Sequence, residues 1–182
     1  MSLLRQSDYE ATFKALAAAH KRIQHTDAAP RFARIVVSPD PYQRSVDLQD
    51  MAKLLGKALK PGPGGQVLVI ESLFTRYDEN GGDNTKRVRH AAFYVLQKIA
   101  TAGDLQAAGD VISQTEETGE QLYGKLQRDL ADQVKVRLVP GSLTNDPVGP
   151  LASGLWYGTR FDFDFTTPGN AALAYHPDAF LP

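Results

Sequence analysis

The stretch 155–165 constrains the fold of this chain more than any other segment. Apolar residues alternate there with polar ones, and a period of two is that of a β-strand with one buried face. Its phenylalanines share one face and its aspartates share the other, namely Phe161, Phe163 and Phe165 against Asp162 and Asp164. The alternation predicts an antiparallel strand with an aromatic face against the core and an acidic face in water.

The segment 104–130 predicts a long helix that covers those phenylalanines. Apolar and small residues recur in it at alternating spacings of three and four, which is typical of one helix face. This seam is formed by Leu105, Ala108, Ile112, Thr115, Gly119, Leu122 and Leu126. Because several of these residues are small, we expect the helix to approach the sheet closely.

The N-terminal third predicts two helices with a strand between them. A helix is expected from Ser7 or Asp8, either of which can cap it, to about Gln24. A strand is expected over 32–37 and a short helix over 47–59, which the glycine- and proline-rich residues that follow bring to an end.

The middle of the chain predicts a hairpin with strands over 66–77 and 88–99. The polar segment 78–87 between them is too long for a two-residue turn, so we expect a projecting, mobile flap. A strand over 134–139 and a loop over 140–153 then lead to the aromatic strand.

The fold class expected from this order is α+β. Two hairpins and an extra strand form an antiparallel or mixed sheet, packed against the long helix and the N-terminal helix. We expect a single domain over residues 1–166. The segment 167–182 has no regular pattern but contains Tyr175 and Phe180, so it is expected to dock on the domain or on a neighbouring subunit.

Composition excludes several classes of protein. The chain has no cysteine, which excludes disulfides and thiolate chemistry, and its net charge of −1 gives no general attraction to nucleic acid. No run approaches the roughly 18 apolar residues of a membrane span, and the N-terminus lacks the apolar core of a signal peptide. We therefore expect no membrane association and a product that stays in the compartment where it is made.

Candidate metal and cofactor motifs are incomplete. His20 and His25 are five residues apart, not the four that place two histidines on one helix face. The glycine-rich residues 61–65 precede a strand, whereas phosphate-binding glycine turns follow one. A calcium loop starting at Asp78 would need glutamate at its twelfth position, where Arg89 stands. We expect no cofactor, no metal ion and no catalytic motif.

The order of elements resembles that of the tail terminator proteins of long-tailed bacteriophages. The resemblance rests on the N-terminal helix and strand, the hairpin with a polar tip, the sheet-covering helix and a last strand entered through Gly154-Leu155-Trp156. It covers roughly residues 5–166. The short helix 47–59 and the tail 167–182 are additions to that pattern.

The resemblance implies a structural virion protein without enzymatic activity. Such proteins form a ring, usually hexameric, where the tail tube meets the neck, and DNA passes through the ring without specific binding. The partners implied are further copies of the chain, the tail tube and the neck or connector proteins. The location implied is the virion, after synthesis in the cytoplasm of the bacterial host.

Candidate interface residues lie in the flap and in the tail. In the flap an acidic group precedes a basic one, Asp78, Glu79 and Asp83 before Lys86 and Arg87. Tyr175 and Phe180 are the corresponding residues of the tail. Asp162 and Asp164 are expected to face the channel, where carboxylates repel phosphates.

Three alternatives remain at this stage. One is another phage neck or tail adaptor or connector protein. Another is a small hydrolase that uses Asp162 and Asp164, which project about 7 Å apart from one strand face, as an acid–base pair. The third is a bacterial adaptor that binds a peptide along an exposed strand edge.

Overall fold

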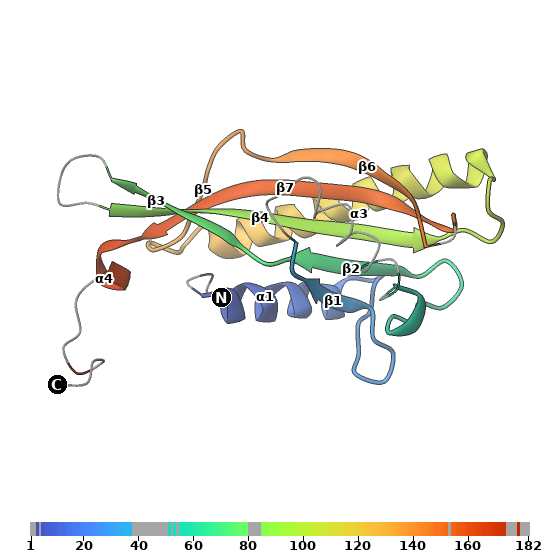
Figure 1. Ribbon diagram of the computed structural model, residues 1–182, viewed down its shortest axis with the longest axis horizontal. Helices are drawn as coiled ribbons and strands as arrows, with labels where there is room; N and C mark the ends of the chain where they lie inside the picture. Colours follow the sequence, from blue (N-terminus) through green and yellow to red (C-terminus); the bar gives the residue numbers. More distant parts are fainter. Residues whose placement is uncertain are drawn as a thin grey trace.

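The fold is α+β, as expected from the sequence. The computed structural model describes residues 3, 5–37, 51, 53, 55–79, 85–152, 154–173 and 178. These residues form a seven-stranded mixed sheet with two long helices packed on one face (Figure 1). No helix among them is long and apolar enough to cross a membrane.

The long strands β4 and β7 form the centre of the sheet. The order is β1-β2-β4-β7-β5, with β3 also paired to β4 and β6 also paired to β7. Only the β1–β2 pairing among those described is parallel. The strands are β1 (Phe32–Ile35), β2 (Gln66–Glu71), β3 (Phe74–Glu79), β4 (Thr85–Lys98), β5 (Arg137–Leu138), β6 (Thr144–Leu151) and β7 (Trp156–Pro168).

The aromatic face of β7 packs under the helices α1 (Gln6–Ala19) and α3 (Leu105–Leu130). Phe161, Phe163 and Phe165 are fully buried, as the alternation predicts. Gly119 is the point of closest approach, because a Cβ atom there would lie 2.0 Å from the ring of Phe161. The small residue predicted for close packing is therefore required by the backbone separation of α3 and β7.

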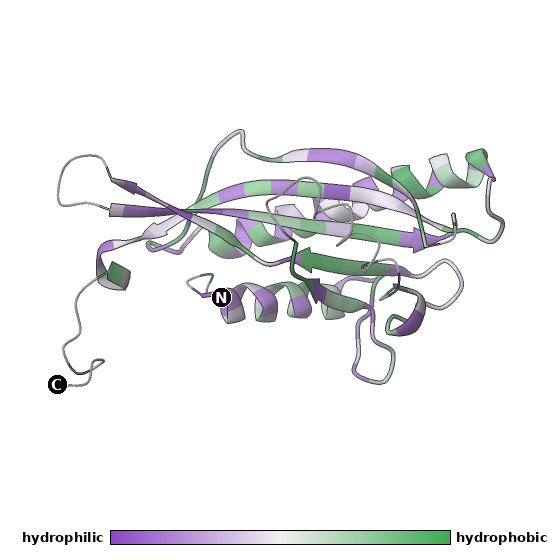
Figure 2. Ribbon diagram, in the orientation of Figure 1, coloured by the Kyte–Doolittle hydropathy of each residue, from purple (hydrophilic) through white to green (hydrophobic). Residues whose placement is uncertain are grey.

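A second apolar cluster lies on the opposite face of the sheet. Residues of the segment 51–59 cover it, and its sheet side is formed by Val67, Val69, Tyr94, Leu96 and Trp156. Both faces of β2 are buried, and its residues 67–70 are all hydrophobic (Figure 2). Residues 51, 53 and 55–57 of the expected helix 47–59 are helical. Residues 47–50, 52 and 54 lie outside the described part.

The first helix is shorter at its end than expected. It ends at Ala19 because His20 takes an extended conformation, and Gln24, the expected last residue, has a positive φ of 52°. The helix begins at Gln6, and Arg5 is the N-cap, with its backbone N–H donating to Asp8 Oδ2 at 3.0 Å. Asp8 therefore contributes its side chain from inside the first turn instead of occupying the cap position.

Most of the segment 140–153, which was expected to be a loop, is a strand. Residues Thr144–Leu151 form β6, which pairs antiparallel with β7 and shifts register between Val148 and Leu151. Pro147 and Pro150 concealed this strand in the sequence, but prolines are tolerated at a sheet edge and near bulges. The expected strand 134–139 is reduced to the two residues of β5.

The segment between the two strands is shorter than the ten residues 78–87 expected from the sequence. β3 continues to Glu79 and β4 begins at Thr85, so the two strands stay paired along most of the polar segment. Asp78 pairs with Lys86 across the strands, and opposite charges at paired positions favour pairing. Only residues 80–84 separate the two strands, and they lie outside the described part. We call residues 74–79 and 85–90 the β3–β4 arm.

The arm extends beyond both helices (Figure 1), and its outer part is hydrophilic (Figure 2). The expected single strand 66–77 is broken before it. Ser72 N–H donates to the Ile35 carbonyl, and Leu73 N–H donates to Gln6 Oε1 at 2.8 Å. These bonds to neighbouring elements replace the sheet hydrogen bonds and separate β2 from β3.

The boundary placed after residue 166 falls inside β7. Thr167 and Pro168 still pair with β4, at Arg87 and Lys86. The chain then forms the short helix α4 (Asn170–Leu173), and the Asn170 side chain accepts a hydrogen bond from Thr85 N–H at 2.6 Å. The first residues of the expected tail are thus part of the sheet and of its margin.

Candidate functional site

The main polar cluster of the molecule lies on the sheet face away from α1 and α3. In the β4–β7 register His90 is opposite Asp164, and Tyr94 is opposite Arg160. The intervening residues Phe93 and Phe161 pair on the helix-covered face. Strand alternation therefore gathers the polar side chains of β4 and β7 on one surface. We call Glu71, His90, Tyr94, Arg160, Asp162 and Asp164 the β4–β7 network.

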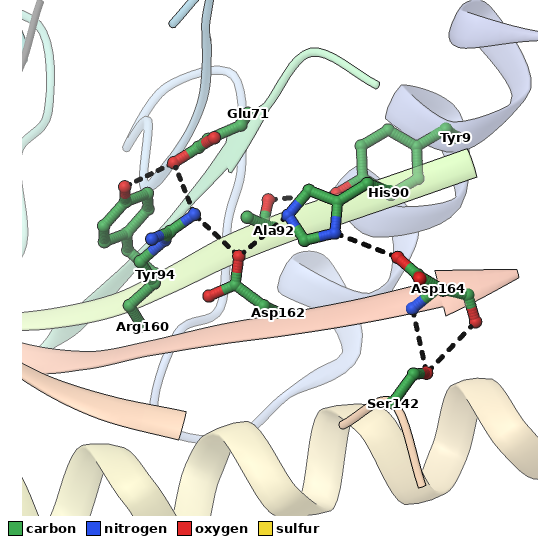
Figure 3. A network of polar contacts seen from close by, with 9 residues as sticks. All are labelled: Tyr9, Glu71, His90, Ala92, Tyr94, Ser142, Arg160, Asp162 and Asp164. Carbon is green, nitrogen blue, oxygen red and sulfur yellow. Dashed lines mark hydrogen bonds and ion pairs between the residues drawn. The ribbon is translucent and has the colours of Figure 1, made fainter. Parts of the chain in front are cut away.

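His90 lies between two carboxylates of the neighbouring strand (Figure 3). Its Nε2 is 3.0 Å from Asp162 Oδ1, and its Nδ1 is 2.9 Å from Asp164 Oδ1. An ionised carboxylate only accepts hydrogen bonds, so both ring nitrogens donate only when the imidazole carries two protons. The geometry therefore favours a positively charged His90.

The same contacts explain the titration of His90. The hydrogen bond to Asp162 raises the pKa of the imidazole above its ordinary value, and the hydrogen bond to Asp164 adds to that rise. Partial burial of the ring lowers the pKa and opposes them. The net direction is upward, which agrees with the charge state that the hydrogen bonds require.

Arg160 extends the network to β2. Its guanidinium lies 2.6 Å from Asp162 Oδ1 and 3.4 Å from Glu71 Oε1. It also lies over the ring of Tyr94, 5.7 Å from the ring centroid, and the Tyr94 hydroxyl donates to Glu71 at 2.5 Å. The chain of contacts therefore connects β2, β4 and β7 across the sheet.

Ser142 fixes the far end of the network (Figure 3). Its Oγ accepts a hydrogen bond from the backbone N–H of Asp164 at 3.0 Å and donates to the Val139 carbonyl at 2.7 Å. The loop between β5 and β6 thus holds the backbone of β7 at the residue whose carboxylate contacts His90. The result is a preorganised position for Asp164.

The arrangement is better suited to holding strands together than to acid–base catalysis. A carboxylate pair that exchanges protons with a substrate or an attacking water must reach it in a shared hollow. Asp162 is mostly buried and its Oδ1 contacts both His90 and Arg160, and Asp164 is half-buried and its Oδ1 contacts His90. One oxygen of each carboxylate therefore connects β7 to β4. In the part of the chain that the structure describes, hollows lie at the end of α3, between His20 and Gln121, and beside Trp156, and none of these has either aspartate in its wall.

The expected wet, acidic face of β7 therefore needs correction. Asp162 and Asp164 do share a face, but two cations, Arg160 and protonated His90, oppose them and Glu71. The cluster has only a small net negative charge. Within the residues that the structure describes, no group of three or more His, Asp or Glu side chains is placed to hold a metal ion.

The expected interface residues are divided between the arm and residues outside the described part. Asp78 and Glu79 are in β3, and Lys86 and Arg87 are in β4. Lys86 is exposed, whereas Arg87 is half-buried and donates from Nε to Thr167 Oγ1 at 3.2 Å. These residues belong to paired strands instead of the mobile flap expected from the sequence. Asp83, Tyr175 and Phe180 lie outside the described residues.

Sequence reasoning missed the partners that neutralise the aspartates. The sequence patterns assign no role beside the aspartates to His90, Glu71 or Tyr94. Arg160 is two and four residues from the aspartates in β7, so strand alternation alone places it on the same face as them. For His90, Glu71 and Tyr94 the signal is the pairing register with β7, which no local pattern contains.

No protein-family model matches this chain, and no curated protein matches it.

Proposed function

We propose that this protein is a structural virion protein of a tailed bacteriophage. It forms a ring, a hexamer in this proposal, at the junction of tail tube and neck, as tail terminators do. In this role it catalyses no reaction and surrounds the DNA without specific contacts. Another neck or tail adaptor or connector is the alternative within the same class.

The observation that supports the proposal is the β3–β4 arm. Phe74 and Tyr77 expose 56% and 46% of their surface there, although large aromatic side chains are usually covered. Among the described strands β3 has β4 as its one partner, so its other edge offers backbone groups for pairing. A surface of this kind on a projecting arm fits contact with a neighbouring subunit or with the tube.

The paired aspartates favour a structural role over the hydrolase alternative. Asp162 contacts both His90 and Arg160, which are the groups that a substrate would have to displace. In the proposed ring Asp162 and Asp164 line the channel. Their partners make that lining weakly acidic, which limits both attraction and repulsion of DNA phosphates.

Light scattering and electron microscopy of the purified protein test this function. The expected result is a closed ring with a mass six times that of the 19.9 kDa chain, and co-sedimentation with isolated tail tubes. Phe74→Asp in the arm is expected to weaken assembly or tube binding without lowering the melting temperature, because the side chain is exposed. A protein that stays monomeric at high concentration and does not bind tubes contradicts the proposal.

A further inference from the structure

The two most exposed large apolar side chains in the described part of the chain stand at opposite ends of α3. Leu105, the first residue of the helix, is 81% exposed, and Val134, four residues beyond its end, is 86% exposed. Leu105 was expected in the buried seam. It is exposed because the start of α3 extends beyond the sheet (Figure 1), and burial of the helix begins at Ala108.

A hollow with an apolar floor and a partly polar rim lies beside Val134. Its volume is about 490 Å³, and Leu130, Val136 and Leu138 contribute to its wall together with the polar residues Gln127, Asp132, Gln133 and Arg137. These residues come from the end of α3, the turn after it, and β5. A hollow of this kind accepts a protruding aliphatic side chain, and Leu105 is such a side chain at the other end of the same helix.

The charges around the two surfaces are complementary. The charged residues nearest Leu105 along α3 are acidic, Asp104 and Asp110, and Lys98 at the end of β4 is the nearest basic residue before them in the chain. Beside the hollow Lys135 and Arg137 are exposed, while Asp132 is an acidic residue of the wall. Unlike charges at the rims of two surfaces guide their approach and fix their orientation.

We propose that the N-terminal end of α3 in one copy of the protein docks in the hollow beside Val134 of the next copy. A helix of 26 residues is about 39 Å long, so the two surfaces cannot meet within one molecule. The contact is head-to-tail, and a head-to-tail contact generates a ring when its rotation closes. The inference rests on the proposed ring function and identifies the subunit contact within it.

Cysteine cross-linking tests the contact directly, because the natural chain contains no cysteine. The double variant L105C/V134C cannot form an internal disulfide, since bridged Cα atoms lie within about 7 Å of each other. Mild oxidation of the assembled protein is expected to give a ladder of covalent oligomers in denaturing gels. The matched control V36C/L105C keeps one partner and moves the other to a second exposed valine, and it is expected to give no ladder.

Leu105→Glu tests the same contact without cross-linking. The expected result is that the concentration for half-assembly rises about tenfold or more, while the melting temperature of the subunit stays unchanged. Val36→Glu is the matched control and leaves assembly unchanged. A ladder from the first pair together with weaker assembly of Leu105→Glu supports the inference.

Two results would overturn it. Rings that form without a ladder, and are as stable with Leu105→Glu as without it, reject this contact but leave the proposed function intact. A wild-type protein that never assembles rejects the contact and the proposed function together.

Discussion

On the face of β4 and β7 that meets the helices, Phe93 stacks on Phe161 with ring centroids 4.9 Å apart. On the opposite face of the same two strands His90 lies between Asp162 and Asp164. The first face depends on shape, because a single added methyl group at Gly119 collides with Phe161. The second depends on charge state. One pair of strands is thus stabilised by two kinds of interaction that respond to different perturbations.

The largest effect is expected from Phe163→Asp on the helix-covered face. The change places an unpaired carboxylate in the centre of the core, and we expect the domain to be unfolded at neutral pH and 25 °C. Circular dichroism and thermal melting provide the measurement. Asp164→Ala, the adjacent residue on the other face, is expected to cost about 1–3 kcal/mol and to leave the protein folded. Equal effects of the two variants would contradict the assignment of the faces.

A smaller effect is expected from Gly119→Ala. The new Cβ atom must displace the Phe161 ring, and such overpacking costs about 1–3 kcal/mol of the free energy of unfolding. Urea denaturation measures it. Gly124→Ala is the matched control on the same helix, since no atom lies within 4 Å of its Cβ position. That variant is expected to stabilise the protein by about 0.5–1 kcal/mol. If Gly119→Ala left the free energy of unfolding unchanged, α3 would have to be able to move away from the sheet.

His90→Gln tests the polar face. The amide cannot carry the positive charge that both aspartates face, and we expect a loss of about 1–2 kcal/mol in the free energy of unfolding. Lys86→Gln removes a charge from an exposed residue of the same strand and serves as the control, with a change within about 0.5 kcal/mol. The idea that His90 fastens β4 to β7 would be wrong if both variants were equally stable.

The smallest effect is the dependence of stability on pH through His90. Its folded-state pKa is raised, so its contribution is fully present below the unfolded value of about 6.5 and is lost as the pH rises through the folded value. Urea denaturation between pH 5 and 9 is expected to show a decline that is absent in His90→Gln. A steeper decline in the variant than in the wild type would reverse the sign of this coupling.

The strand 155–165 and the long helix were predictable because each contains its own periodicity. The phenylalanines and Gly119 are where the alternation and the seam place them. β6 was not predictable, because Pro147 and Pro150 suppress the strand pattern that β7 then imposes through pairing. The β4–β7 network was not predictable for another reason. His90 and Asp164 are separated in the sequence by the whole of α3, and they meet only because of the register between β4 and β7. A shift of that register by two residues would separate them and still keep the apolar side chains on the core face.

The position of β7 has a consequence for biosynthesis. β7 pairs with β4, β5 and β6, and all three precede it in the chain. While a ribosome is still translating residues before 156, the apolar underside of α3 and one edge of β4 have no strand to cover them. Fragments that stop before this point therefore expose Phe93 and Leu122, which makes them targets for chaperones and proteases, and the sheet closes only after the Trp156–Pro168 segment has left the exit tunnel.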